Sequence, residues 1–163
     1  MACEAVLGDR SLVAGDAMIA AHFDLLPTAR AASQARGLVA EALGRRTAPA
    51  GAAELTDTAQ LLVSELVTNG LMHARTELHL GISGDTQTLL FTVADGHPDA
   101  PDLSPGVPAD FDYEESGRGM AIVVALASDF GWRRREDGAG KVMWFTLSLP
   151  TNENASAPVE SPA

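Results

Sequence analysis

The stretch SELVTNGLMHA, residues 64–74, decides how this chain is interpreted. Its apolar residues recur at helical spacing, yet it also holds Thr68, Asn69, Gly70 and His73, which are weak helix formers. Such residues lower the stability of a helix, because they lose conformational freedom in it or compete for its backbone hydrogen bonds. We therefore ask why this helix contains them.

The residues of the predicted helix divide between two faces. One stripe is apolar or small, has a period of 3.6 residues and is expected to face the core: Ala59, Leu62, Val63, Leu66, Val67, Gly70, Leu71 and Ala74. The opposite stripe is polar: Ser64, Glu65, Thr68, Asn69, Met72 and His73. Within it, Glu65, Asn69 and His73 follow at four-residue intervals, so their side chains line up along the helix. A carboxylate and a short amide one turn apart can hold a hydrated cation and a water.

The helix by itself leaves a second interpretation open. Asn69 and Gly70 are typical of helix ends, so the helix can also end there and leave His73 in a loop. Against this, an ordinary solvated face would use long charged side chains, whereas this one uses short polar groups of fixed reach. In a continuous helix, Gly70 would let a neighbouring element approach closely.

An aspartate ends the second apolar strand of the chain. The segment VADGHPDAP, residues 93–101, places Asp95 directly after the run LLFTV. A carboxylate there can accept a hydrogen bond from an exocyclic amine such as that of adenine, while the end of the strand packs on the ring. The alternative is an ordinary turn aspartate, which is common where a strand ends.

A glycine-rich loop opens the last predicted helix. In ESGRGMAIV, residues 115–123, Gly117 and Gly119 allow the backbone to approach a ligand closely. The free N–H groups and the dipole of a helix N-terminus favour phosphate, and Arg118 can add a charge-assisted contact. A single Gly-x-Gly before a helix is nevertheless a weak signal.

The remaining pattern alternates strands with helices. We predict a strand at 17–26, a helix at 27–46 capped by Thr28, and a helix from near Asp57 to Ala74 with Gln60 as capping-box partner. Further elements are strands at 77–83 and 88–95, a long loop to Gly119, a buried helix at 120–130 and a closing hairpin at 131–149. This order predicts an α+β fold, a two-layer sandwich whose mixed, mostly antiparallel sheet is covered on one face by helices. We expect one domain at 16–150, a flexible segment at 1–15 and a disordered tail at 151–163.

Composition excludes several classes of protein. The net charge of −11 argues against direct nucleic-acid binding and against docking on an anionic membrane. Cys3 is the only cysteine, which fits a reducing compartment, and no apolar run reaches the roughly 18 residues that span a bilayer. We expect a cytoplasmic protein. The basic run from Arg133 to Arg135 is interpreted as a solvated strand edge.

The order of these motifs resembles that of a known superfamily. A helix with Glu and Asn, a strand-end Asp, a flexible loop and Gly-x-Gly at a helix start are similar to the GHKL ATP-binding superfamily, over residues 17–150. That superfamily includes the ATP domains of gyrase and histidine kinases. More narrowly, SELVTNGLMHA, ESGRGMAIV and GKVMWFTLSLP resemble the anti-sigma factor serine/threonine kinases, its stand-alone members.

The resemblance implies a role for each matching residue. Glu65 would be the general base, Asn69 the Mg²⁺ ligand and Asp95 the carboxylate that recognises adenine. The other matching residues are Gly117, Arg118 and Gly119 in a lid over the phosphates, His73 among the nucleotide-binding residues, and Thr68 in a supporting position. The implied ligands are ATP or ADP with Mg²⁺, and the implied partners are a sigma factor and its anti-sigma factor antagonist. A homodimer is compatible with the same resemblance.

The sequence departs from the family at three places. The strand-end aspartate usually begins an Asp-x-Gly-x-Gly pattern, whose third and fifth positions are here His97 and Asp99. Kinase members can carry a basic residue before the Ser-Gly of the lid, where this chain has Glu115. The closing strand often starts Gly-Thr-Thr, and here Lys141 and Val142 remove a hydroxyl that could serve the phosphate or adenine.

Three hypotheses about function follow. The first is an ATP-binding anti-sigma factor that phosphorylates its antagonist on Ser or Thr. The second is an ATP-binding sensor that sequesters a sigma factor or another partner without phosphoryl transfer, which the departures favour. The third is a metal enzyme using His22, His73, His79 and His97, which the sequence disfavours because no ligand spacing such as His-Glu-x-x-His occurs.

Overall fold

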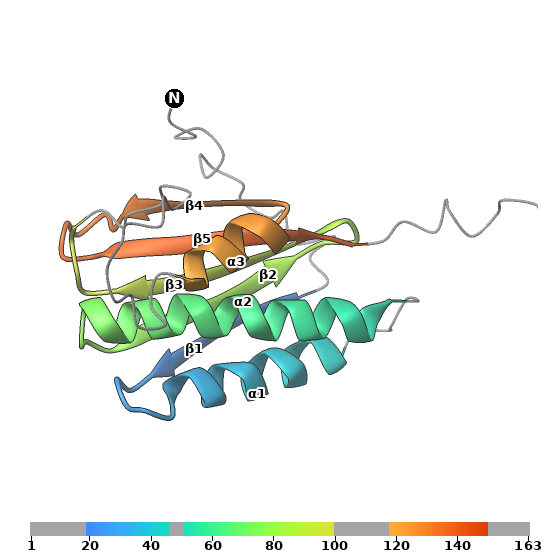
Figure 1. The fold of residues 1–163 in the computed structure, drawn as a ribbon, viewed down its shortest axis with the longest axis horizontal. Coiled ribbons are helices and arrows are strands. Elements are labelled where there is room, and N and C mark those ends of the chain that lie inside the picture. The colour runs from blue at the N-terminus through green and yellow to red at the C-terminus, as the bar shows by residue number, and fades with distance from the viewer. Residues whose placement is uncertain (1–18, 46–50, 100–117, 150–163) are drawn as a thin grey trace, which may run out of the picture.

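One antiparallel sheet carries helices on one of its faces (Figure 1). The computed structural model describes residues 19–45, 51–99 and 118–149. Within these ranges the elements are β1 (Ile19–Leu25), α1 (Ala31–Gly44), α2 (Ala52–His73), β2 (Leu78–Gly84), β3 (Thr88–Asp95), α3 (Arg118–Leu126), β4 (Asp129–Arg134) and β5 (Lys141–Ser148). The strand order is β1-β2-β3-β5-β4, and every neighbouring pair is antiparallel. The predicted α+β sandwich is confirmed. The sheet was expected to be mixed, but all pairings among the described strands are antiparallel.

The inner face of the sheet forms half of the core. Alternate residues of β3 point toward the helices, and Phe91 and Val93 are fully buried there. The ring of Phe91 stacks on that of Phe145 in β5, with centroids 4.8 Å apart and planes inclined by 11°. The predicted strand at 88–95 is confirmed at both ends, and its alternation directs the carboxylate of Asp95 to the helix side.

The helix α2 crosses the sheet and packs against α1, α3 and β3 (Figure 1). Its buried apolar and small residues belong to the predicted core stripe: Ala59, Leu62, Val63, Leu66, Val67 and Gly70. Leu71 and Ala74, at the end of that stripe, are half-buried. The helix continues through Asn69 to His73, so the interpretation that it ends early is wrong.

The start of α2 was predicted incorrectly. The helix begins at Ala52 rather than near Asp57, after Gly51, whose φ of 88° is the left-handed conformation that glycine accepts readily. The run that follows Gly51 is rich in good helix formers, which extends the helix backwards. Gln60 therefore lies inside the helix, where its Nε2 donates a hydrogen bond to the carbonyl of Arg36 at 3.0 Å instead of forming a capping box.

The predicted cap of α1 is also wrong. The helix begins at Ala31, and the side chain of its N-cap residue, Arg30, makes no capping hydrogen bond. Thr28 Oγ1 accepts a hydrogen bond from the backbone N–H of Arg30 at 3.3 Å, and its carbonyl accepts one from Ala31 at 3.0 Å. Thr28 thus forms a turn ahead of the helix rather than its cap.

Ser64 does not belong to the polar face to which the spacing assigned it. It is 8% exposed and lies between the two long helices. Its hydroxyl donates to the carbonyl of Gln60 at 2.8 Å and accepts from Arg36 Nη1 of α1 at 3.1 Å. Ser64 therefore joins α1 to α2.

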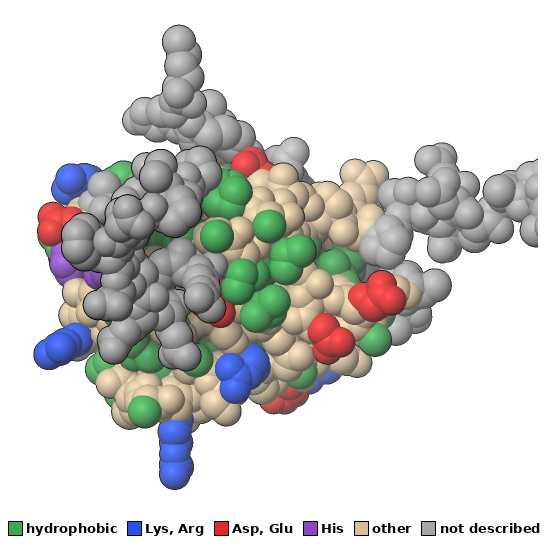
Figure 2. Space-filling model, viewed as in Figure 1, with side chains coloured by type: hydrophobic (Ala, Val, Ile, Leu, Met, Phe, Trp, Pro, Cys, Tyr) green, Lys and Arg blue, Asp and Glu red, His purple; other side chains and the backbone are tan. Residues whose placement is uncertain are grey.

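The predicted buried helix at 120–130 is shorter and more exposed than expected. α3 ends at Leu126, and the chain then enters β4, whose Phe130 packs against the core. On α3, Val123 is buried while Leu126 is 48% exposed. Figure 2 shows apolar side chains at the surface around the position of α3. An apolar composition does not by itself distinguish a helix covered on all sides from one covered on a single side.

The closing hairpin is confirmed. β4 pairs with β5, and the turn is closed by a hydrogen bond from the N–H of Arg135 to the carbonyl of Gly140 at 2.9 Å. Arg133 and Arg134 are exposed on this edge strand, as predicted from the basic run.

Several predictions concern residues that are not described. These are the flexible segment 1–15, the tail 151–163 and the loop before α3 from residue 100 onward. Among the helices that are described, none combines the length and hydropathy needed to span a bilayer.

Candidate functional site

The helix α2 connects the two halves of the predicted site. At Gly70 it meets the end of β3, where an added Cβ would lie 3.7 Å from Asp95 Oδ2. Earlier on the same helix, Glu65 meets the first turn of α3, where a Cβ added to Gly119 would collide with the Glu65 carboxylate. The two acidic side chains of the predicted site therefore both lie at α2: Glu65 projects from this helix toward α3, and Asp95 projects from β3 toward the helix.

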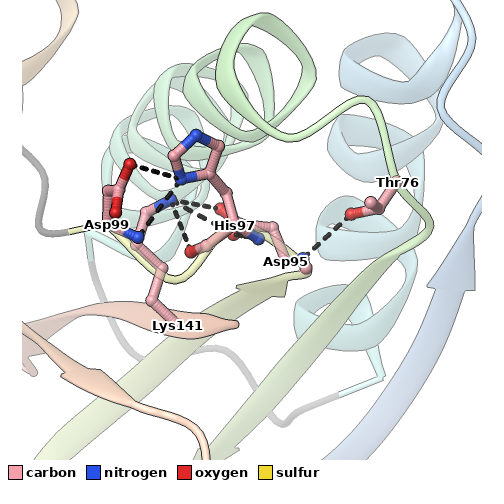
Figure 3. A network of polar contacts seen from close by, with 6 residues as sticks. Thr76, Asp95, His97, Asp99 and Lys141 are labelled. Atoms are coloured by element: carbon pink, nitrogen blue, oxygen red, sulfur yellow. Dashed lines mark hydrogen bonds and ion pairs between the residues drawn. The ribbon is translucent and has the colours of Figure 1, made fainter. Parts of the chain in front are cut away.

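The carboxylate of Asp95 forms a buried ion pair with Lys141 (Figure 3). The Nζ of Lys141 lies 3.0 Å from Oδ2 and 3.1 Å from Oδ1. The two residues are 1% and 3% exposed. Each charge is therefore compensated mainly by the other, because little solvent reaches either one.

The strand register explains why these two residues meet. Asp95 at the end of β3 is the direct cross-strand partner of Lys141 at the start of β5, so their side chains emerge on the same face. The preceding residue, Gly140, is buried, and a Cβ there would collide with the backbone carbonyl of Asp95. Glycine at this position lets the two strand ends approach.

The pleat separates the two departures found at the start of β5. Val142 follows Lys141 and therefore points to the other face of the sheet. It lines a shallow hollow there, together with Thr92 and Ala94 of β3. The missing hydroxyl at position 142 consequently lies away from Asp95, and only Lys141 changes the surroundings of that carboxylate.

The residues after β3 form a tight turn around the same carboxylate. The N–H of His97 donates to Asp95 Oδ1 at 2.8 Å, and the carbonyl of His97 lies 3.4 Å from the Nζ of Lys141. The N–H of Asp99 donates to His97 Nδ1 at 3.2 Å. Asp95 is thus both a turn aspartate, as the alternative interpretation held, and a buried acceptor that faces the helix layer.

Thr76 is a residue that the sequence analysis missed. Its Oγ1 accepts a hydrogen bond from the backbone N–H of Gly96 at 2.9 Å, which ties the segment after α2 to the turn after β3 (Figure 3). A Cβ added to Gly96 would lie 2.9 Å from the Thr76 methyl carbon. An isolated threonine carries no sequence signal for this contact, because the contact joins residues of two separate connections.

The other predicted site residues differ in exposure. Asn69 is half-buried, as is Glu65, whereas Thr68 and His73 are exposed on α2. Arg118 begins α3, while Gly117 lies outside the described residues and so does most of the predicted lid. The N-terminus of α3 carries a partial positive charge that favours the nearby carboxylate of Glu65.

No group of three or more His, Cys, Asp or Glu side chains that could hold a metal ion occurs among the described residues, which include the four histidines. An octahedral Mg²⁺ site of the kind found in phosphotransferases needs fewer protein ligands, because water and phosphate oxygens complete it. Asn69 and Glu65 are the described side chains of the predicted site that offer oxygen ligands on the polar face of α2.

A comparison with protein families agrees with this arrangement. The model of the histidine kinase-like ATPase domain matches residues 25–147, which is more than half of the chain. No curated protein matches the sequence. The matched segment runs from the end of β1 into β5 and contains α2, Asp95 and the start of α3. The chain therefore belongs to the histidine kinase-like ATPase domain family, within the GHKL superfamily of ATP-binding proteins.

Proposed function

We propose that the protein is an anti-sigma factor that uses Mg²⁺-ATP to phosphorylate its antagonist protein on a serine or threonine. The observation that supports transfer is the position of Glu65, whose half-buried carboxylate lies against Gly119 at the N-terminus of α3. That end of a helix favours phosphate. A carboxylate held beside it is placed to accept the proton of an attacking hydroxyl.

The surroundings of Asp95 fit a nucleotide base. Its carboxylate is buried at the end of β3, where a Cβ added to Gly70 would lie 3.7 Å from Oδ2 and 2.9 Å from the side chain of Leu78. An exocyclic amine directed at Oδ2 would donate a charge-assisted hydrogen bond, the stronger class of such bonds. Asp95 would thereby fix the base, while Glu65 lies further along α2 at the phosphate end.

The polar face of α2 fits a metal ion on the phosphates. Asn69 lies one turn after Glu65 and is half-buried, so its amide oxygen is available as a Mg²⁺ ligand. When bound, ATP supplies the transferred phosphoryl group and Mg²⁺ compensates its charge. Gly119 and Arg118 at the start of α3 would hold the phosphates through backbone N–H groups and the guanidinium.

A second function is favoured by one residue. Glu115 directly precedes the Ser-Gly of the predicted lid in the sequence, where kinase members can carry a basic residue. Negative charge at that place opposes the build-up of charge on a transferred phosphoryl group. A protein of this kind would bind ATP and sequester a sigma factor without transferring phosphate.

Removal of the base separates the two functions. Glu65→Gln keeps the shape of the side chain and removes its basicity, so transfer from radiolabelled ATP to a purified antagonist protein should fall by on the order of 10²–10⁴-fold. ATP affinity should change little, because the base serves the hydroxyl rather than the nucleotide. Glu54→Gln, an exposed position in the first turn of the same helix, is the matched control and should transfer at the wild-type rate.

Asn69→Ala should behave differently from Glu65→Gln. Loss of the metal ligand should weaken both Mg²⁺-ATP binding and transfer, while binding of ATP in EDTA should be unchanged. If Glu65→Gln transfers phosphate at the wild-type rate, Glu65 is not the general base. If wild-type protein binds ATP but transfers phosphate to no antagonist, the sensor function is the correct one.

A further inference from the structure

We propose that the outer face of the sheet holds a second binding site, which takes a small organic anion with an apolar body and a carboxylate or phosphate group. The site is the shallow hollow beside Val142, on the face of the sheet opposite to Asp95 and the helices. This inference does not depend on the proposed kinase function. It gives a role to two features that the nucleotide site leaves unexplained, Val142 and the basic residue Arg133.

The floor of the hollow consists of small side chains on three adjacent strands. It is formed by Gly81 of β2, Thr92 and Ala94 of β3, and Val142 of β5. Gly81 pairs with Thr92 and Ala94 pairs with Val142 across the strands, so these positions form two neighbouring rows on one face. The hollow has a volume of about 340 Å³, within the range of roughly 300–1,000 Å³ that is usual for small-molecule sites. A flat apolar group can therefore lie on this floor.

Two polar side chains approach Gly81 from its neighbouring strands. A Cβ added to Gly81 would lie 2.4 Å from Thr92 Oγ1 and 3.4 Å from His22 Nδ1. The hydroxyl and the imidazole thus converge on the space that the glycine leaves free. Within the described part of the chain, neither side chain has a hydrogen-bond partner. Both are therefore available to a ligand that lies in the hollow.

The charges around the hollow favour an anionic ligand. Asp24 is the acidic side chain among the described residues that line it, and its Oδ1 lies 2.7 Å from Nδ1 of His79. Because a carboxylate oxygen only accepts, the hydrogen of this bond belongs to the imidazole. Arg133 lines the hollow from β4, is exposed and makes no ion pair with another described residue. A chain of net charge −11 thus presents here an unpaired guanidinium and a carboxylate that is already paired.

The strand register determines how the ligand lies. One row crosses all the strands of the sheet through successive cross-strand partners, namely Asp24, His79, Ala94, Val142 and Arg133. Arg133 is the direct neighbour of Val142, whereas Asp24 lies three strand spacings from it, or about 14 Å. The acidic group of the ligand therefore binds at the β4 end, where a guanidinium can form paired hydrogen bonds to carboxylate or phosphate. Its apolar body lies over Val142 and Ala94.

Benzoate is the test ligand, and amide NMR of the isotopically labelled protein is the measurement. The amide signals of Gly81, Thr92, Ala94 and Val142 should shift saturably, with a dissociation constant in the millimolar range or tighter. Benzamide has the same shape without the charge and should bind more weakly by on the order of tenfold. Phenyl phosphate compares the two acid groups, and saturable binding of either anion at these amides supports the proposal.

Two neighbouring arginines provide the matched variants. Arg133→Met should weaken benzoate binding by on the order of tenfold, because it removes the cation that pairs with the acid group. Arg134→Met is the control, since Arg134 is equally on the exposed edge strand but alternation directs it to the other face. It should leave the dissociation constant unchanged. Ala94→Leu fills the floor and should abolish the saturable shifts; if circular dichroism shows that it does not fold, Arg133→Met decides the test.

Four results would overturn the proposal. The first is that neither anion shifts these amides. The second is equal weakening by Arg133→Met and Arg134→Met, which indicates attraction to charge in general. The third is binding of benzamide as tightly as benzoate. The fourth is displacement of benzoate by Mg²⁺-ATP, which places the anion in the nucleotide site instead. Failure of the protein to bind or use ATP would contradict the proposed function and leave this test unaffected.

Discussion

The ion pair between Asp95 and Lys141 makes a strong prediction about stability. Each single replacement, Lys141→Met or Asp95→Asn, leaves its partner buried without a counter-charge. At an effective dielectric constant of about 20, unit charges 3 Å apart attract by about 5.5 kcal/mol, and desolvation offsets much of this. Removal of one partner of a buried pair nevertheless costs about 3–5 kcal/mol, because the remaining charge is uncompensated.

The double variant should be much more stable than either single variant. In Asp95→Asn with Lys141→Met no charge remains, and the amide oxygen of Asn can still accept the hydrogen bond from His97. Buried pairs replaced by neutral groups of similar volume are often close to wild type in stability. We therefore expect a coupling free energy of about 2 kcal/mol or more between the two positions.

Urea unfolding of the protein without nucleotide, followed by circular dichroism, measures this cycle. With a slope near 2 kcal/mol per molar urea, a loss of 4 kcal/mol lowers the midpoint by about 2 M. The exposed pair between Arg135 and Asp137, at 2.7 Å, is the comparison, and Arg135→Met should shift the midpoint far less. Additive single losses, or a loss below about 1 kcal/mol in Lys141→Met, would refute the reasoning that the pair is buried and coupled.

Two further predictions concern a glycine and a turn. Gly70→Ala should destabilise the protein by about 1–3 kcal/mol in thermal unfolding, because the new methyl would lie 2.9 Å from Leu78 Cδ2. It should also weaken ATP binding, because the methyl would lie 3.7 Å from Asp95 Oδ2 at the proposed base site, and full ATP affinity would contradict this. The Ala139 N–H, with help from Arg135, holds the pKa of Asp137 below its ordinary value of 3.8. Its contribution to stability is therefore present above the unfolded-state pKa and lost as pH falls through the folded-state pKa, so the destabilisation by Asp137→Asn at pH 7 should vanish in acid; an NMR titration midpoint at or above 3.8 would contradict it.

Most of the fold was predictable because its periodic patterns are strong. The strand at 88–95 is a short apolar run whose residues are alternately buried in the structure, and the stripe on α2 follows the helical period over several turns. The errors concern the ends of helices, where residue propensity is a weaker guide than the periodic pattern is within an element. Gly51 begins α2 through its backbone conformation rather than through a capping side chain. The outer side of α3 is apolar, and the sequence analysis therefore predicted a buried helix, although Leu126 is exposed at the surface.

The candidate site was predictable where one element carries its signal. Glu65 and Asn69 follow from helical spacing, and Asp95 follows from its place at the end of a strand. The ion pair with Lys141 was not predictable in this way, since it depends on the register between β3 and β5, which are separated by α3 and β4. From the sequence, Lys141 was noted only because it replaces a hydroxyl residue of the family pattern. That comparison gives no information about which residues the lysine contacts.

The weak helix formers in α2 have a physical explanation in the structure. The helix does not depend on their propensity, because Leu62, Leu66 and Val67 are buried on its other face and tertiary packing supplies most of its stability. The polar face is therefore free to hold residues chosen for the site. Gly70 lies on the buried face and has a different explanation: a Cβ there would lie 2.9 Å from Leu78 Cδ2, so its missing side chain weakens the helix but allows β2 to pack closely. A better helix former at this position would stabilise the isolated helix and collide with Leu78 in the folded protein.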